Sequence, residues 1–216
     1  MNTKINKSKT KLSSIRTDID NIDAKLQQLI NQRAELAKKI GLAKDKKGTS
    51  TDFYKPEREA AVLRSVIERN NGPLRDVEMV RLFREIMSAC LAQQEPLKIG
   101  FLGPEGTFTQ AAVYKQFGHS VRALPYGSID EVFHEVESHT ADFGVVPIEN
   151  STEGTVNNTL DMFVSSPLNI CGEIELRIEH HLLGKVKDLK NIHRICAHEQ
   201  ALAQCRDWVR EYLPDV

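Results

Sequence analysis

The sequence predicts two parts of different fold class: an all-α domain of three helices over residues 1–95, and an α/β domain over residues 96–216. The first prediction rests on residues 11–46, which contain no proline and no glycine before Gly41. The second rests on a change of hydrophobic period near Leu97, after which short apolar runs alternate with amphipathic stretches. That alternation is typical of strands and helices that build a mostly parallel sheet.

The first predicted helix carries two apolar lanes that repeat every seven residues, a pattern typical of a helix that pairs with another helix. The lanes are Ile15, Ile22, Leu29 and Leu36, and Ile19, Leu26, Arg33 and Ile40. At about 1.5 Å per residue the helix is roughly 50 Å long, too long to pack on a domain of this size. We therefore expect a homodimer in which the first helices of two copies pair.

Arg33 places a guanidinium in the middle of one apolar lane. Lys44 lies eleven residues later, three helical turns on and on the same face. Arg16 lies roughly 100° around the helix from Arg33 and about 25 Å away. If all three cations bind one small ligand, Arg16 must come from the partner chain. The alternative is that Arg33 is a paired residue that sets the register of a plain coiled coil.

Two shorter helices complete the predicted all-α domain. A polar break at residues 46–51 precedes a helix at 56–69, which has a proline in its first turn. The sequence Asn71-Gly72-Pro73 ends this helix and starts a third, and residues 93–96 form a linker. Taken alone, the pair Arg58-Glu59 is typical of a solvated ion pair on a helix.

Several of these residues together resemble the all-helical class of chorismate mutase. The resemblance covers about residues 8–95 and rests on Ile15-Arg16, Asp23, Gln32-Arg33-Ala34-Glu35-Leu36-Ala37, Lys44 and Pro56-Glu57-Arg58-Glu59. It implies an intertwined dimer that rearranges chorismate to prephenate. That reaction requires a dicarboxylate to be held in a compact conformation while charge grows on its ether oxygen.

The resemblance also implies a role for individual residues. Arg33, together with Arg16 of the partner chain, would clamp the two substrate carboxylates. Lys44 and Gln94 would donate hydrogen bonds to the ether oxygen.

The remaining mutase roles fall on the second and third helices. Glu59 would accept the substrate hydroxyl, and Arg58 would brace the cluster. Cys90 stands where well-studied members have a serine, and a thiol is a weaker donor. Lys55 stands where they have an aspartate, which puts the role of that acid in doubt.

The predicted α/β domain contains two loops of one design, in which a strand is followed by a Gly- and Thr-bearing turn and a helix N-terminus. Strands are expected at 97–102, 121–124, 142–148, 168–178 and 192–197, and helices at 110–117, 128–139, after 156 and at 200–213. The two loops, 103–109 and 149–156, would present backbone N–H groups to an anion at the carboxyl ends of strands. They predict a small carboxylate ligand, and the alternative is two ordinary, well-capped turns.

Both loops resemble those of prephenate dehydratase. The matching segments are Gly103-Pro104-Glu105-Gly106-Thr107-Phe108 and Pro147-Ile148-Glu149-Asn150-Ser151-Thr152-Glu153-Gly154-Thr155-Val156, with a third at His198-Glu199-Gln200-Ala201-Leu202-Ala203-Gln204-Cys205. The resemblance implies two lobes around a cleft, as in periplasmic binding proteins, and conversion of prephenate to phenylpyruvate. Thr107, Asn150, Ser151 and Thr155 would line the substrate-binding loops.

The order of the two parts resembles the bifunctional chorismate mutase–prephenate dehydratase family of phenylalanine biosynthesis. That family has a Thr-Arg-Phe motif and a phenylalanine-binding regulatory domain, which we expect downstream of Val216. We therefore expect an active mutase and a C-terminally incomplete dehydratase domain that lacks activity. The alternative is a mutase joined to a non-catalytic carboxylate-binding module.

The composition argues against several other functions. A net charge of −1 gives no overall attraction to nucleic acid or anionic lipid, and no apolar run approaches the length of a membrane span. The four cysteines show no CxxC pairing, which favours a reducing compartment. The seven histidines show no metal-ligand spacing. We expect a cytoplasmic enzyme with small-molecule substrates, no cofactor and no metal.

Overall fold

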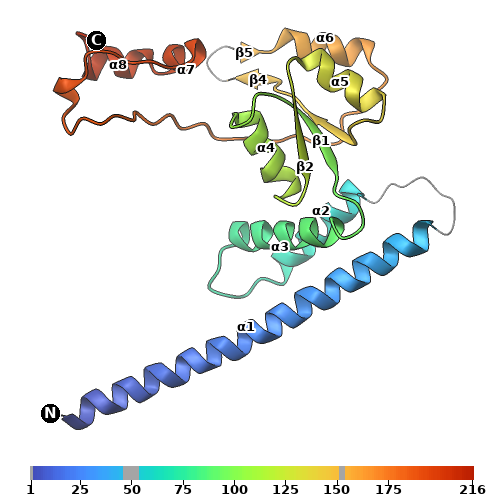
Figure 1. Ribbon diagram of the computed structural model, residues 1–216, viewed down its shortest axis with the longest axis vertical. Coiled ribbons are helices and arrows are strands. Elements are labelled where there is room, and N and C mark those ends of the chain that lie inside the picture. Colours follow the sequence, from blue (N-terminus) through green and yellow to red (C-terminus); the bar gives the residue numbers. More distant parts are fainter. Residues whose placement is uncertain (1, 46–53, 151–153) are drawn as a thin grey trace.

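The computed structural model describes residues 2–45, 54–150 and 154–216, and the side chains of residues 2–11, 44–45 and 200 lie outside this description. The helical half of the chain consists of α1 (Asn2–Asp45), α2 (Pro56–Glu68) and α3 (Asp76–Leu91). The α/β half begins at β1 (Lys98–Leu102) and lies beside α2 and α3 (Figure 1). The change from helices to strands near residue 97 is confirmed.

α1 confirms the long first helix predicted from about residue 11 and extends it to Asn2. Residues 2–10 contain neither glycine nor proline, so nothing in them stops a helix. α1 contacts α3, and the least exposed of its described side chains lie near its C-terminal end: Arg33, Ala34, Ala37 and Gly41. The rest of α1 extends away from the other elements (Figure 1).

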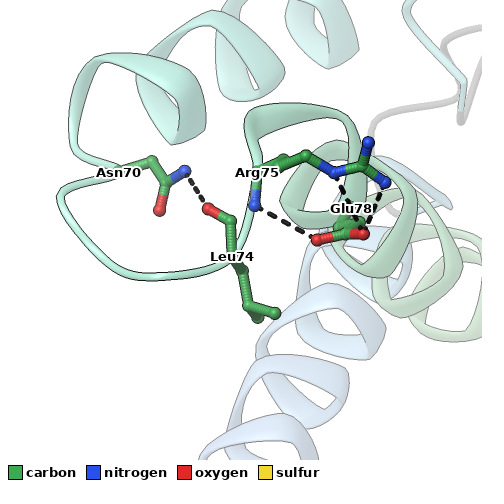
Figure 2. Close-up of polar contacts among 4 residues, drawn as sticks. All are labelled: Asn70, Leu74, Arg75 and Glu78. Atoms are coloured by element: carbon green, nitrogen blue, oxygen red, sulfur yellow. Dashed lines mark hydrogen bonds and ion pairs between the residues drawn. The ribbon is translucent and has the colours of Figure 1, made fainter.

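The turn between α2 and α3 is fixed by side-chain caps (Figure 2). Asn70 Nδ2 donates to the carbonyl oxygen of Leu74 at 2.9 Å. The backbone N–H of Arg75 donates to Glu78 Oε2 at 3.1 Å, and Arg75 Nη2 donates to Glu78 Oε1 at 2.8 Å. The guanidinium of Arg75 holds the pKa of the Glu78 carboxyl below its usual value. The Glu78 carboxylate thus satisfies the backbone N–H of Arg75, the N-cap residue of α3.

The α/β half is built on a parallel three-stranded sheet with the order β2-β1-β3. Its further elements are β2 (Arg122–Tyr126), β3 (Phe143–Val145), α4 (Phe108–Phe117) and α5 (Ile129–Glu137). The chain passes from β1 to β2 through α4 and returns past β1 to β3 through α5. Right-handed crossovers in opposite directions place α4 and α5 on opposite faces of the sheet, and α4 faces the helical half (Figure 1).

The apolar core is centred on β1 and α4, where Ile99, Phe101 and Val113 are fully buried. Tyr54, two residues before the start of α2, belongs to the same core. Its ring lies 5.6 Å from the ring of Phe117 and 5.3 Å from that of Phe143. One apolar cluster therefore joins the two halves.

A polar junction between α3 and the end of α4 reinforces this contact. Glu85 accepts hydrogen bonds from the backbone N–H of His119 at 3.1 Å and from its ring Nδ1 at 2.8 Å. Gly118 has a φ of 74°, and a Cβ at this position would lie 2.6 Å from the Cβ of Ser88. Glycine is therefore required there both for its backbone conformation and for the close approach of α3.

The prediction of strands at residues 168–178 and 192–197 is wrong. After α6 (Asn157–Ser165) both segments are irregular, with a short 3-10 turn, η1 (Leu189–Asn191), between them. A strand requires a neighbouring backbone to share its hydrogen bonds. Among the described residues, no backbone pairs with either segment.

The first of these segments covers the core by side-chain packing. Ile174 packs against the core cluster, and Lys115 Nζ donates to the carbonyl oxygen of Glu175. The predicted helix at 200–213 is divided into α7 (Glu199–Gln204) and α8 (Arg206–Tyr212), which lie to one side of the sheet (Figure 1). In the described parts of the chain, no helix combines the length and the hydropathy needed to cross a membrane.

Candidate substrate sites in the two halves

Two loops of the α/β half meet at one edge of the sheet. β1 and β3 are parallel neighbours, so their carboxyl ends lie side by side. The loop at residues 103–107 follows β1, and residues 146–156 follow β3. The strand order reverses between these two strands, which is where open α/β sheets bind their ligands.

Thr107 ties the first loop to the sheet. Its hydroxyl donates to the carbonyl oxygen of Leu102 at the end of β1 and accepts from the backbone N–H of Gln110, each at 3.4 Å. The side chain of Gln110 accepts in turn from the backbone N–H of Gly106 at 2.6 Å. Thr107 is thus the N-cap of α4 and sets where the positive end of that helix points.

The second loop forms a small antiparallel pair before α6, β4 (Glu149–Asn150) with β5 (Gly154–Thr155). Asn150 is half-buried and Thr155 is exposed, whereas Ser151 lies outside the described residues. The fully buried Thr159 donates from Oγ1 to the carbonyl oxygen of Pro147 at 2.7 Å and so anchors α6 to the loop. Sequence reasoning missed Thr159, although a threonine in the first turn of a helix is a usual anchor of this kind.

In the helical half, Gln94 lies against α1. Its Oε1 is buried and has no hydrogen-bond partner among the described residues. A Cβ built at Gly41 would lie 2.8 Å from that oxygen. Arg33 is half-buried on α1, and the backbone of Lys44 continues the same helix, but its side chain is outside the described residues. A buried amide oxygen without a partner is a group to which a polar ligand would hydrogen-bond.

Glu59 pairs with groups at the junction of the two halves. Arg84 Nε donates to Glu59 Oε1 at 3.3 Å, and Arg84 Nη1 donates to the carbonyl oxygen of Lys115 in α4 at 3.0 Å. The Tyr54 hydroxyl hydrogen-bonds to Glu59. Burial, then the charge of Glu59 and this hydrogen bond, raises the pKa of Tyr54 above its usual value. Sequence reasoning missed both Tyr54 and Arg84, because only the fold brings them to Glu59.

Three further predicted residues differ in accessibility. Cys90 is buried, whereas Arg58 and Arg16 are exposed. Arg33 lies seventeen positions after Arg16 on the helix, which corresponds to about 25 Å, so one chain does not bring these two together. Among the described residues, no group of three or more His, Cys, Asp or Glu side chains is placed to hold a metal ion.

Comparison with known families assigns the two halves. The model of the prephenate dehydratase family matches residues 99–216, more than half of the sequence. This chain belongs to the prephenate dehydratase family. Preceding that match, the model of chorismate mutase type II matches residues 15–95. The two resemblances seen in the sequence are therefore confirmed, and the change from one family to the other falls between α3 and β1.

Curated relatives of this dehydratase-family chain contain both parts. Identity is 52% over 209 residues with a protein of Pseudomonas aeruginosa, 42% over 209 with one of Aquifex aeolicus and 30% over 228 with one of Escherichia coli K12. Each is named bifunctional chorismate mutase/prephenate dehydratase, and each alignment covers 95% of this chain. The chain spans about 57% of the length of these relatives.

One solved structure also matches the dehydratase-family chain. It is the crystal structure of prephenate dehydratase from Arthrobacter aurescens in complex with L-Phe, at 36% sequence identity and a TM-score of 0.43. The match covers 56% of this chain and 41% of that one.

Proposed function

We propose that residues 1–95 form a chorismate mutase domain and residues 96–216 a domain that binds prephenate, in an enzyme of phenylalanine biosynthesis. The observation that carries this proposal is the order of the two family matches along one chain. The product of the first reaction is the substrate of the second, which gives a chemical reason to join the domains. Prephenate dehydratase is the second of the two activities named for the longer relatives.

The mutase site is proposed to lie where Gln94 meets α1. Arg33 and Arg16 of the partner subunit would hold the two carboxylates of chorismate. Lys44 and Gln94 would donate to the ether oxygen, where negative charge develops as the bond breaks. The unpaired Oε1 of Gln94 supports this role, because rotating the amide by 180° exchanges Oε1 and Nε2 with little change of shape.

Glu59 is proposed to accept the hydroxyl of the substrate, with Arg58 bracing the cluster and Cys90 lining it. Glu59 is 13% exposed, and the Arg84 guanidinium lies 3.3 Å from one of its two carboxylate oxygens. A carboxylate has several acceptor positions, so this pairing leaves room for a further hydrogen bond.

A homodimer through α1 is proposed to complete each mutase site. The seam residues Ile15, Ile19, Ile22, Leu26, Leu29, Leu36 and Ile40 are 47–60% exposed in the single chain. A row of apolar side chains this long is typical of a surface that a partner covers. Because the partner's first helix also brings its Arg16, association and catalysis depend on the same helix.

The α/β half is proposed to bind prephenate at the edge formed by its two loops, with Thr107, Asn150, Ser151 and Thr155 around the ligand. The first-turn N–H groups of α4 supply hydrogen-bond donors and a partial positive charge for a carboxylate. By family membership we further propose a two-lobed arrangement around this edge. We also propose a cytoplasmic location, which is supported by four free cysteines.

The test is to follow chorismate consumption by the purified chain while measuring prephenate and phenylpyruvate separately. Prephenate formation is the expected result, and its absence would overturn the mutase assignment. Phenylpyruvate formed faster than by acid breakdown would assign dehydratase turnover to the α/β half. Saturable prephenate binding without phenylpyruvate would instead identify a carboxylate-binding module. Arg33→Met serves as the control for contaminating mutase.

A further inference from the structure

Gly41 is a buried glycine close to the C-terminal end of a long helix. Glycine inside a helix costs about 0.5–1 kcal/mol relative to alanine, because it loses more backbone freedom on folding. Its φ lies outside the left-handed region, so its backbone conformation does not require glycine. A local reason for glycine must therefore come from what packs against it.

The neighbour of Gly41 is the side chain of Gln94. A Cβ at position 41 would lie 2.8 Å from Gln94 Oε1, 2.9 Å from Cγ and 3.0 Å from Cδ. These distances are shorter than ordinary van der Waals contact, which begins near 3.5 Å between carbon atoms. All three atoms belong to one flexible side chain, so a methyl group at position 41 would move the amide and leave the backbone in place.

We infer that Gly41 is a positioning residue that fixes the carboxamide of Gln94 in the mutase site. The inference rests on the proposed function, because Gln94 acts there as the donor to the ether oxygen. Gly41 precedes Lys44 by three residues, and residues at this spacing are neighbours on a helix surface. The backbone of Lys44, the second proposed donor, therefore lies one helical turn from the glycine that contacts the amide.

The inference predicts opposite effects on stability and on turnover. Gly41→Ala favours the helix, and the displaced amide is the end of a flexible side chain, so the variant folds at least as stably. The amide is moved from a position where it stabilises charge in the transition state. The loss of transition-state stabilisation should therefore lower kcat and leave KM nearly unchanged.

The experiment measures kcat, KM and Tm for the unmutated chain, Gly41→Ala and Gly72→Ala. In Gly41→Ala we expect kcat to fall about 10- to 100-fold, as for other displacements of about 1 Å, with an equal or higher Tm. Gly72 is the matched control, because a Cβ there meets no atom closer than 3.9 Å. An unchanged kcat in Gly41→Ala would overturn the inference, as would a fall of kcat accompanied by a lower Tm.

A double-variant cycle tests whether Gly41 acts through Gln94. Once Gln94→Ala has removed the amide, adding Gly41→Ala should cause no further loss of kcat. If adding Gly41→Ala to Gln94→Ala lowered kcat as much as Gly41→Ala does alone, Gly41 would have another role and the inference would be overturned. Absence of turnover in the unmutated chain would overturn the proposed function itself, an outcome that is distinct from either of these.

Discussion

The helical half and the α/β half position their polar residues by different means. In the α/β half, the parallel pairing of β1 with β3 alone brings two loops to one edge of the sheet. In the helical half, Arg16 and Arg33 lie on one long helix, which keeps them about 25 Å apart. A sheet can assemble a site from distant segments of one chain, whereas a single long helix needs a second copy to do so.

The two halves also differ in what they bury. Ile99, Phe101 and Val113 in the α/β half are fully buried, whereas the seam residues of α1 are about half exposed. The stability of the α/β half therefore comes from contacts within the chain. In the proposed homodimer, burial of the α1 seam would contribute its free energy only on association. Substitutions should accordingly affect stability in one half and assembly or turnover in the other.

The largest effect is expected from Arg33→Met, which separates a catalytic cation from a seam residue. Loss of one charge-stabilising donor should raise the activation free energy by about 3–4 kcal/mol, which corresponds to at least a 100-fold lower kcat for chorismate. Lys38→Met, on an exposed position of the same helix, is the control. A more stable dimer with unchanged turnover would show that Arg33 only sets the register of a coiled coil.

The next largest effect is expected from Leu29→Glu, which places a charge in the exposed seam. Each leucine buried in the proposed dimer contributes about 2–3 kcal/mol. The dimer of the variant should therefore dissociate into monomers at a much higher protein concentration than the unmutated dimer. Mutase activity should be lost as the dimer dissociates. Molar mass by light scattering and chorismate turnover check this, with Asn31→Glu on the opposite face as the control. A monomer that kept full mutase activity would contradict the role of Arg16 of the partner subunit.

The sequence was informative wherever a local pattern determines the structure. The seven-residue repeat predicted α1, and the helix predicted at 128–139 is confirmed as α5, where Ser128 Oγ accepts from the Glu131 N–H at 3.2 Å. The Gly- and Thr-bearing turn after β1 predicted a helix from residue 110, and α4 begins two residues earlier, at Phe108, with Thr107 as its N-cap. These features depend on contacts within a few residues, which a single sequence contains.

The sequence was misleading wherever a segment depends on distant partners. Residues 168–178 have the alternating side chains of a strand, but in the structure Ile174 packs on the core without backbone pairing. Tyr54 and Arg84 reach Glu59 only because α2, α3 and α4 meet. The spacing of hydrophobic residues in a sequence indicates which side chains are buried, but it does not indicate which other segment's backbone lies beside them.

A smaller effect, confined to the α/β half, is expected from Thr107→Val. The substitution removes the N-cap hydroxyl of α4 and should cost about 1 kcal/mol, which lowers Tm by roughly 2–4 °C in a chain of this size. Prephenate binding should weaken because the loop is no longer tied to the end of β1. Chorismate turnover should be unchanged, with Thr109→Val as the control. A loss of mutase activity as large as the loss of prephenate binding would show that the two halves are not independent.

The smallest effect is expected at the junction between the two halves, from the contribution of the Glu85 carboxylate to stability. Burial raises the pKa of Glu85, but hydrogen bonds from the ring and backbone of His119 outweigh burial and hold the pKa below the usual 4.5. A carboxyl with a lowered pKa stabilises the fold above its unfolded pKa, and this contribution is lost as the pH falls through the folded value. Both side chains are partly exposed, so the contribution should be about 0.5 kcal/mol.

Glu85→Gln removes that charge and keeps the shape of the side chain. The difference in unfolding free energy between the unmutated chain and this variant should be largest near neutral pH. It should shrink as the pH falls below about 4.5, where the unmutated Glu85 also becomes neutral. Denaturant titrations at several pH values check this, with Glu211→Gln on exposed α8 as the control. A difference independent of pH would mean that the junction between α3 and α4 is held by shape alone, by the close contact of Gly118 with Ser88.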